Sequence, residues 1–433
     1  MTMNSSKDYV ILEYRAYPNK KQQEIFSQCF GHNRFVHNHF LDLNIRHYEE
    51  TKKFIFYFDR GEDDGLASLL AQLKKEKGYE WLNDVPSHSL QYTVKNLSDS
   101  LGSFKKLGRG FPKFKSRNRH EDSFTLTQNI VDFHIKESEG RIKFPKGIGL
   151  VKVKFHRPII GKPKQIVVKR DKTGCYYVSI KCDISGFLPE QIKAIKNAVG
   201  CDLGIKDMMI FSDGEVFENK KFFKKSEKKI KRRQRRLSRK KKGSKNREKA
   251  RKRLAKAFKK LNNQKTDYIR QSVSSKVKDN DLIVLETLNL LGMLKNHKLA
   301  KSLCDVSLGQ VIKEFEWQCR KRGKILIFID QWFPSSQTCS NCGYINKEVK
   351  NLKVREWDCP VCGTHHNRDI NASINVLHEG LRKAINNGIL DFRQIPQELR
   401  KFTLTRKGEI SKDPSLTNDS CSKDYQSKKP QNL

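Results

Sequence analysis

Apolar residues recur at intervals of three or four in the first quarter of this chain, and this spacing predicts helices. A first helix, starting soon after the break at Pro18 and Asn19, is indicated by a series of apolar positions: Ile25, Phe26, Cys29, Phe30, Val36, Phe40 and Leu43. Two more helices are indicated by shorter series: Leu66, Leu69, Leu70 and Leu73, then Tyr92, Leu97, Leu101 and Phe104. We interpret the aromatic residues in these series as core residues.

A different pattern, alternation of apolar and polar residues, predicts strands from Glu121 to about Asp183, and the apolar segment at residues 8–16 is also predicted to be a strand. Between Glu121 and Asp183, Thr173-Gly174 marks a hairpin turn. These strands predict a small barrel or sheet that the N-terminal strand completes. The helices at 20–107 are then an insertion into it.

The second half of the chain mixes short apolar strands with helices. Residues 184–196 are expected to be a linker with a short helix. Strands are then predicted at AVGCDLG (198–204), in a hairpin over 205–217 that turns at Asp213-Gly214, at DLIVLE (281–286) and at KILIFID (324–330), with a helix over 307–320.

The charge of the chain changes the functional picture. Its 433 residues carry a formal net charge of +40, which indicates a polyanionic partner. Lys220 to Lys260 alone holds 24 basic residues against two acids, more than half of that net charge. Apolar residues recur every seven positions in its first part, so we predict a helical hairpin that binds nucleic-acid backbone, not a solvated face or a disordered tail. Its candidate contacts are Arg232, Arg233, Arg235 and Arg236.

A second basic segment, GRGFPKFKSRNR at 108–119, combines glycines, a proline, basic residues and two phenylalanines. It cannot form a regular element, and its composition suits phosphate contact with base stacking. A solvated loop is an equal alternative. The candidate contacts are Lys113, Lys115 and Arg117.

Cysteines form the clearest local motif. Cys339 and Cys342 make one Cys-x-x-Cys pair, Cys359 and Cys362 make another, and sixteen residues separate the pairs. This spacing predicts one tetrahedral Zn²⁺ site with four thiolates, so the nearby His365 and His366 are surplus. The other seven of the eleven cysteines are scattered, which suits a reducing cytosol. The N-terminus has no apolar signal core, and the aliphatic runs are too short to cross a membrane.

Three acids stand in similar settings. Asp202 lies in an apolar strand, Glu286 ends another, and Asp369 opens the helical pattern that follows the cysteines. A mixed sheet of the ribonuclease H type, in which the first and fourth strands are neighbours, brings such acids together. Their carboxylates would hold Mg²⁺ or Mn²⁺ for phosphodiester hydrolysis by a two-metal mechanism. The alternatives are an N-cap role for Asp369 and three unrelated acids.

Several of these segments resemble one known family. GCDLG (200–204), Glu286 closing LIVLE, PSSQTCSNCG, CPVCG and NRDINAS are similar to the RuvC nuclease and zinc-ribbon segments of transposon-encoded TnpB proteins and compact type V-F CRISPR effectors. YRAYPNKKQQEIFSQCFGHNRFVHNHF and GFPKFKSRNR are similar to the same family. The resemblance covers nearly all of residues 8–390.

The resemblance implies a multidomain α+β fold, with a wedge β-barrel (1–18 and 122–190) interrupted by a helical recognition lobe (19–121). A split RuvC-like nuclease follows (191–338 and 363–400), with the basic helical hairpin (220–278) and a zinc ribbon (339–362) inserted. The tail at 401–433, which is polar and unpatterned, is predicted from its composition to be disordered. The resemblance also implies the catalytic and magnesium-binding roles of Asp202, Glu286 and Asp369, the zinc ligands Cys339, Cys342, Cys359 and Cys362, and a phosphate contact from Arg368.

The activity that the resemblance implies is RNA-guided cleavage of double-stranded DNA beside a T-rich motif, in the prokaryotic cytosol. The partners are a guide RNA and target DNA, with no membrane. A homodimer on one guide is left open, as is the choice between a transposon-encoded protein and a CRISPR effector. An unguided RuvC-type nuclease or transposase accessory protein, and a nuclease-inactive nucleic-acid binder, are the alternative functions.

Overall fold

A computed structural model describes residues 8–58, 65–117, 121–127, 134–351 and 353–400. The predicted disordered tail lies outside these residues. The chain divides into two compact units: residues 1–187 with 233–256, and residues 188–232 with 257–433. Among the described helices, none has both the length and the apolar composition needed to cross a lipid bilayer.

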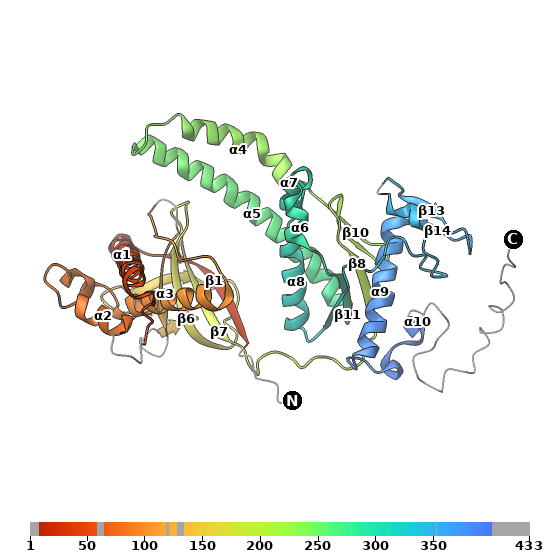
Figure 1. Cartoon of the computed structure of the whole chain (residues 1–433), viewed down its shortest axis with the longest axis horizontal. Helices are drawn as coiled ribbons and strands as arrows, with labels where there is room; N and C mark the ends of the chain where they lie inside the picture. The colour runs from red at the N-terminus through yellow and green to blue at the C-terminus, as the bar shows by residue number, and fades with distance from the viewer. Residues whose placement is uncertain (1–7, 59–64, 118–120, 128–133, 352, 401–433) are drawn as a thin grey trace. The chain divides into compact units, whose positions relative to one another are not determined.

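The first unit contains a seven-stranded antiparallel sheet. Its strands are β1 (Tyr9–Tyr17), β2 (Asp122–Thr127), β3 (His134–Lys136), β4 (Arg141–Phe144), β5 (Gly149–Lys154), β6 (Lys162–Arg170) and β7 (Tyr176–Asp183). The order is β2-β6-β7-β1-β5-β4-β3, and the sheet curls into a half-barrel (Figure 1). The prediction that the N-terminal strand completes this sheet is confirmed, because β1 pairs with both β5 and β7.

Helices separate β1 from β2 in the chain. They are α1 (Lys20–Thr51), α2 (Leu66–Leu73), the 3₁₀ turn η1 (Glu80–Asp84) and α3 (Ser87–Leu107). The side chain of Asn19 caps α1 by accepting a hydrogen bond from the Gln22 amide, and the Gln22 side chain accepts one from the Asn19 amide. Phe26 of α1 is fully buried against Phe124 of the sheet, so α1 packs on the half-barrel.

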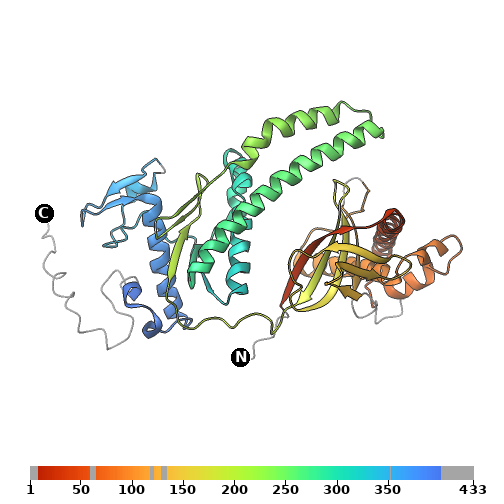
Figure 2. The same cartoon turned by 180° about the vertical axis from the view of Figure 1, so that it is seen from behind.

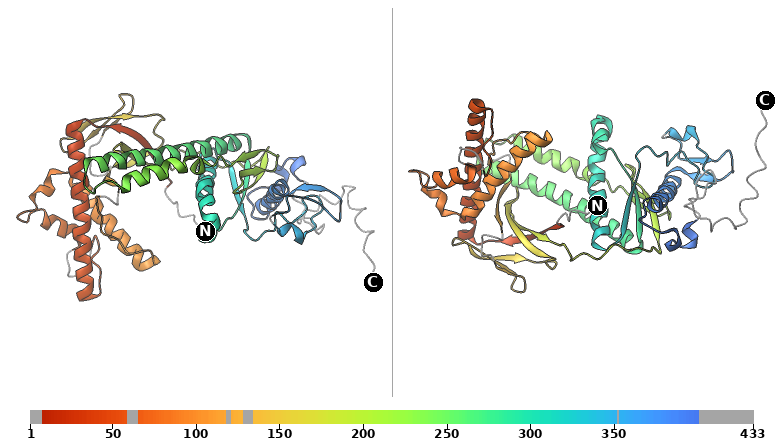
Figure 3. Two further views of the ribbon diagram at one scale, coloured as in Figure 1. Left: turned by 90° about the horizontal axis from the view of Figure 1, so that it is seen from above. Right: turned by 60° about the horizontal axis from the view of Figure 1, so that its bottom comes forward.

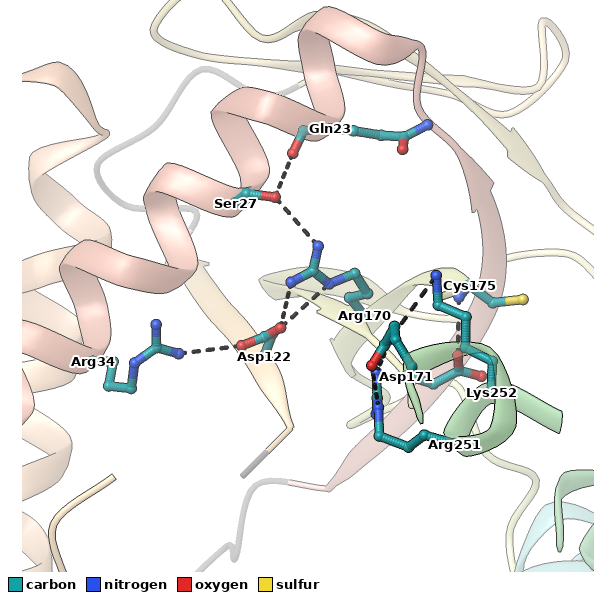
Figure 4. Close-up of polar contacts among 10 residues, drawn as sticks. Gln23, Ser27, Arg34, Asp122, Arg170, Asp171, Cys175, Arg251 and Lys252 are labelled. Atoms are coloured by element: carbon teal, nitrogen blue, oxygen red, sulfur yellow. Dashed lines mark hydrogen bonds and ion pairs between the residues drawn. The ribbon is translucent and has the colours of Figure 1, made fainter. Parts of the chain in front are cut away.

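A cluster of charged groups joins α1 to the edge of this sheet. Asp122, at the start of β2, accepts hydrogen bonds from Arg34 of α1 at 3.3 Å and from Arg170 of β6 at 2.6 Å (Figure 4). Arg170 also donates to the Ser27 hydroxyl at 3.3 Å. Because Asp122 is largely shielded from water, these bonds fix the position of α1 on β2 and β6 more firmly than surface ion pairs would.

The second unit has a five-stranded sheet with the order β10-β9-β8-β11-β12. Its strands are β8 (Ala198–Asp202), β9 (Asp207–Phe211), β10 (Val216–Glu218), β11 (Leu282–Glu286) and β12 (Ile325–Ile329). Its helices are α6 (Leu290–Lys295), α7 (His297–Val306), α8 (Leu308–Lys321), α9 (Arg368–Asn386) and α10 (Gln397–Arg400). The remaining short elements are η2 (Lys347–Lys350), η3 (Phe392–Gln394), β13 (Glu356–Asp358) and β14 (His365–Asn367).

Two cores sandwich the five-stranded sheet. α5 (Lys245–Asp279) and α8 bury Val273 and Phe315 on one face, and α9 buries Val376 and Leu381 on the other. Figures 1 and 2 show these helices on opposite sides of β8 and β11. β11 lies parallel to β8, so the predicted adjacency of these two strands is confirmed.

Glycines allow α9 to lie close to the sheet. A Cβ atom on Gly200 of β8 would come within 2.2 Å of the Ser373 carbonyl oxygen. One on Gly380 of α9 would come within 2.3 Å of Val284 in β11. Both distances are far below van der Waals contact, so the lack of a side chain at these two positions sets the distance between helix and sheet.

The basic segment between β10 and β11 forms the predicted helical hairpin. α4 (Phe222–Ser238) runs antiparallel to the first half of α5, and Gly243, at φ +83°, lies in the turn between them (Figure 3). Ile230 and Leu261 are buried in its thin apolar seam, whereas most of its basic residues are exposed.

One local prediction is wrong. Residues 184–196 contain turns but no helix. Gly186 adopts a φ of +77°, and Pro189 follows soon after, so neither the backbone conformation nor the hydrogen bonding of a helix can be continued there.

Candidate active site and metal centre

Two acids end neighbouring strands of the five-stranded sheet. Asp202 is the last residue of β8, and Glu286 is the last residue of β11. The parallel register pairs Cys201 with Leu285, so the next residue of each strand is one of the acids. The two carboxylates therefore lie at the same edge of the sheet.

The third acid comes from α9, which packs against β8 and β11. Asp369 is in the first turn of this helix. The N-cap is Asn367, whose side chain accepts hydrogen bonds from the amides of Asp369 and Ile370 at 3.2 and 3.3 Å. Asp369 is therefore not the N-cap, and its carboxylate is available for another interaction.

Electrostatics link the three acids. Burial and the negative charges of Glu286 and Asp369 raise the pKa of Asp202 from 3.8 to about 8, and the positive charge of Arg368 opposes this. Burial also raises the pKa of Glu286, against a lowering effect of its hydrogen bond from Ser335. Glu286 and Asp369 therefore both lie near enough to Asp202 for their charges to act on its carboxyl group.

Two arginines next to this group have different surroundings. Arg368 is only 7% exposed, and its guanidinium donates to the Asn351 carbonyl at 3.0 Å. The side chain of Arg355 is half exposed, and its Nη1 lies 3.3 Å from the Asp369 carboxylate. The sequence marks Arg368 through its position beside Asp369, but nothing in the sequence marks Arg355. Arg355 precedes Asp369 by fourteen residues, and their contact depends on how the cysteine-rich segment folds back onto α9.

Ser335 is a second residue near the acids that sequence patterns do not single out. Its hydroxyl donates a hydrogen bond to the Glu286 carboxylate. Ser335 is buried, and it precedes the first cysteine pair by four residues. It lies in PSSQTCSNCG, a segment that carries the family resemblance, but no pattern within that segment assigns it a role.

The four cysteines of the two pairs come together. The sulfur atoms of Cys339, Cys342, Cys359 and Cys362 all lie within 4.8 Å of one another. Four thiols at this spacing fit a tetrahedral Zn²⁺ ion, which four deprotonated cysteines hold in structural sites. Among the described residues, this is the one group of three or more such side chains with ligand atoms this close together.

His366 lies beside the cysteine cluster. Its Nε2 is 3.0 Å from the sulfur of Cys339, and its ring packs near that of Trp357. Since four thiols already complete a tetrahedron, this imidazole is placed to donate a hydrogen bond to a thiolate ligand. His365 instead contacts Asp358 at 2.8 Å.

The predicted nucleic-acid contacts lie on two elements. In the loop after α3, Lys113 and Arg117 are exposed, whereas Lys115 is half-buried and burial lowers its pKa. The loop is attached to α1, because the side chain of Asn38 exchanges two hydrogen bonds with the backbone of Lys115.

On α4 the four arginines point largely to solvent. Arg232, Arg235 and Arg236 are exposed, and Arg233 is partly exposed with a hydrogen bond to the Arg253 carbonyl. These side chains are therefore able to meet a polyanion over the C-terminal part of α4.

Comparison with known families finds three matches along the chain. Residues 12–53 match a helix-turn-helix domain of OrfB proteins, residues 166–297 match a family described as "Probable transposase", and residues 309–376 match a Cas12f1-like TNB domain. The first match covers β1 and the single continuous helix α1, so these residues do not form a helix-turn-helix here.

Two solved structures have a similar fold. One is titled a Cas12f1-sgRNA-target DNA complex (TM-score 0.52, 13% identity, 86% of this chain and 98% of that chain). The other is the mini-RNA-guided endonuclease CRISPR-Cas_phi3 (TM-score 0.51, 11% identity, 87% and 92%). At these identities the likeness shows the fold alone, a multidomain α+β fold of the Cas12f type.

Two curated relatives cover most of the chain. A protein of Streptomyces pristinaespiralis named "Putative RNA-guided DNA endonuclease" is 30% identical over 93% of this chain and 95% of its own length. "Putative RNA-guided DNA endonuclease InsQ" of Escherichia coli is 28% identical over 83% of this chain and 89% of its own length. A relative of Acanthamoeba polyphaga mimivirus is named "TnpB-like protein L770". It is 25% identical over 53% of this chain and 46% of its own length. This chain belongs to the TnpB family that these relatives represent.

Proposed function

We propose that this protein is an RNA-guided DNA endonuclease with a single metal-dependent active site at Asp202, Glu286 and Asp369. The observation that supports the proposal is geometric: Asp202 and Glu286 end adjacent parallel strands, and Asp369 is in the first turn of the helix that packs on both strands. We infer that the activity is guided by RNA from the names of the curated relatives.

The chemistry follows from the charges at this edge of the sheet. Two Mg²⁺ or Mn²⁺ ions bound by the three carboxylates would activate a water and stabilise the leaving oxygen during phosphodiester hydrolysis. Burial and the neighbouring acids raise the pKa of Asp202, which favours its protonated form in the metal-free protein, so metal binding there would be linked to release of that proton. Arg368 favours the release, because its guanidinium stabilises the Asp202 carboxylate.

The basic surfaces supply nucleic-acid binding in this proposal. The α4–α5 hairpin contributes phosphate contacts from Arg232, Arg233, Arg235 and Arg236. Lys113, Lys115 and Arg117 contribute contacts from the loop after α3. The guide RNA would pair with double-stranded DNA beside a T-rich motif, in the prokaryotic cytosol.

The proposed domains follow the predicted boundaries. The wedge comprises 1–18 and 122–190, the recognition lobe 19–121, the RuvC-like nuclease 191–338 and 363–400, and the ribbon 339–362. The family described as "Probable transposase" favours a transposon-encoded protein over a CRISPR effector.

The test is cleavage by the purified full-length protein with the RNA that co-purifies with it. Sequencing should find one abundant RNA species, and DNA matching its guide should be cut only when Mg²⁺ or Mn²⁺ is present. Asp202→Ala should abolish cleavage and retain DNA binding. Glu316→Ala, at an exposed acid of α8 in the same unit, is the matched control and should cut like wild type.

Each alternative function predicts a different result. Cleavage without a specific RNA would indicate an unguided nuclease. RNA-dependent DNA binding without cleavage by the wild-type protein would indicate a nuclease-inactive binder. Equal cleavage by the wild type and Asp202→Ala would refute the active-site assignment.

A further inference from the structure

A short turn connects the cysteine cluster to Glu286. The amide and hydroxyl of Thr338 both donate to the Pro334 carbonyl, at 3.2 and 2.8 Å, so residues 334–338 form a closed turn. Ser335, the second residue of this turn, donates through its hydroxyl to the Glu286 carboxylate. The end of the turn leads directly into Cys339.

Two buried asparagines of α9 hold this turn in place. The Asn375 side-chain amide donates to the Ser335 carbonyl at 2.8 Å and to the Thr338 carbonyl at 2.6 Å. The Asn371 side chain donates to the Thr338 carbonyl at 2.7 Å and accepts from the Ser340 amide at 2.9 Å. Both asparagines are almost completely buried, so these hydrogen bonds are the partners that their side-chain amides would otherwise lack.

We propose that Ser335 is a positioning residue for Glu286, and that the zinc ribbon acts through the 334–338 turn to hold Glu286 ready to bind a divalent metal. This inference rests on the proposed function. The ribbon fixes Cys339, the asparagines of α9 fix the turn, and the Ser335 hydroxyl fixes one carboxylate oxygen of Glu286. This hydrogen bond would restrict the rotamers of Glu286, so less ordering of its side chain would be needed when a metal binds.

The experiment measures Mn²⁺ binding by electron paramagnetic resonance on the full-length, zinc-loaded protein after RNA is removed. The site-specific signal is the part that Asp202→Ala abolishes. Ser335→Ala should weaken this binding by about 10-fold or more, in the range usual for losing a hydrogen-bond partner of a metal ligand. Ser335→Thr keeps the hydroxyl and should restore binding. Ser340→Ala is the control, because Ser340 contacts Asn371 through its backbone amide.

The zinc content of each variant shows whether a loss of Mn²⁺ binding comes from the position of Glu286 or from unfolding of the ribbon. Ser335→Ala should retain the zinc of the wild type, whereas Cys342→Ser with Cys362→Ser should lose zinc and weaken Mn²⁺ binding. Adding Ser335→Ala to that cysteine variant should weaken Mn²⁺ binding little further, because both changes break the same series of contacts from the ribbon to Glu286.

The inference is overturned if Ser335→Ala binds Mn²⁺ like wild type, or if it loses zinc. It is also overturned if the zinc-free variant binds Mn²⁺ normally. Failure of the proposed function would look different: wild type and Asp202→Ala would then bind Mn²⁺ equally.

Discussion

The guanidinium of Arg355 lies 3.3 Å from the carboxylate of Asp369. Arg355 belongs to the cysteine-rich segment, and Asp369 to the first turn of α9, so this ion pair places a positive charge where a divalent metal is proposed to bind. A metal that binds Asp369 must compete with this charge.

Replacing Arg355 by Gln should therefore strengthen Mn²⁺ binding to the RNA-free protein. The Arg355 side chain is half exposed, and exposed pairs contribute about 0.2–1 kcal/mol, so the expected change is a few-fold decrease in Kd. A Mn²⁺ titration measures it. Lys353→Gln, an exposed charge nearby, is the control, and weaker binding by Arg355→Gln would contradict the prediction.

The raised pKa of Asp202 predicts a pH dependence of stability. The unfolded carboxyl loses its proton near pH 3.8 and the folded one near pH 8, so between these values the folded state binds more protons. Stability should fall as pH rises, by up to about 1.4 kcal/mol per pH unit.

The measurement compares thermal unfolding of wild type and Asp202→Asn, both zinc-loaded and free of Mg²⁺. The stability of Asp202→Asn relative to wild type should increase from pH 5 to pH 8 and then level off. A difference that is constant with pH would show that Asp202 is ionised throughout.

Close packing of α9 on the sheet predicts an effect of Gly380→Ala. The added Cβ would meet Val284 at 2.3 Å, and such overpacking costs about 1–3 kcal/mol of unfolding free energy. Gly31→Ala is the control, because no atom lies within 4 Å of its added Cβ, and it should stabilise α1 by up to about 1 kcal/mol. Urea denaturation measures both, and an unaffected Gly380→Ala variant would be inconsistent with this packing.

The arginines of α4 should control the salt dependence of nucleic-acid binding. Changing Arg232, Arg233, Arg235 and Arg236 to Gln should weaken binding and reduce the slope of log K against log salt by up to about 0.9 per lost phosphate contact. Fluorescence anisotropy at several salt concentrations measures the slope. The four matching Lys substitutions keep the charge and should keep most of the slope; an unchanged slope in the Gln variant would exclude α4 as a contact surface.

Zinc binding should depend on the clustered cysteines alone. Cys359→Ser should reduce the zinc content well below one per chain, because three thiolates no longer complete the tetrahedron. Mass spectrometry of bound metal checks this. Cys304→Ser changes an exposed thiol outside the cluster and should keep the zinc; retention of zinc by Cys359→Ser would refute the ligand set.

Local patterns predicted much of the fold. The apolar series at Phe26 and Phe40 indicated α1, and alternation at Phe124 and Leu126 indicated β2, because helix and strand periods are properties of short segments. The adjacency of β8 and β11 also followed from their acids, although 79 residues lie between Asp202 and Leu282.

Contacts that depend on returning loops could not be predicted. Ser335 meets Glu286, and Arg355 meets Asp369, only because the segment before α9 folds back across the sheet edge. The cap of α9 could not be predicted either, since both Asn367 and Asp369 are good capping residues and only the backbone at the helix start decides between them.

The position of α9 near the end of the described chain has a consequence for protein synthesis. β8 and β11 leave the ribosome first, but the third acid and the helix that covers this face of the sheet follow more than 80 residues after Glu286. A nascent or prematurely terminated chain that stops before Arg368 therefore has the basic hairpin but not the full set of carboxylates. With the proposed active site, such fragments are expected to bind nucleic acid without cutting it, and cleavage is expected only after translation has passed Asp369.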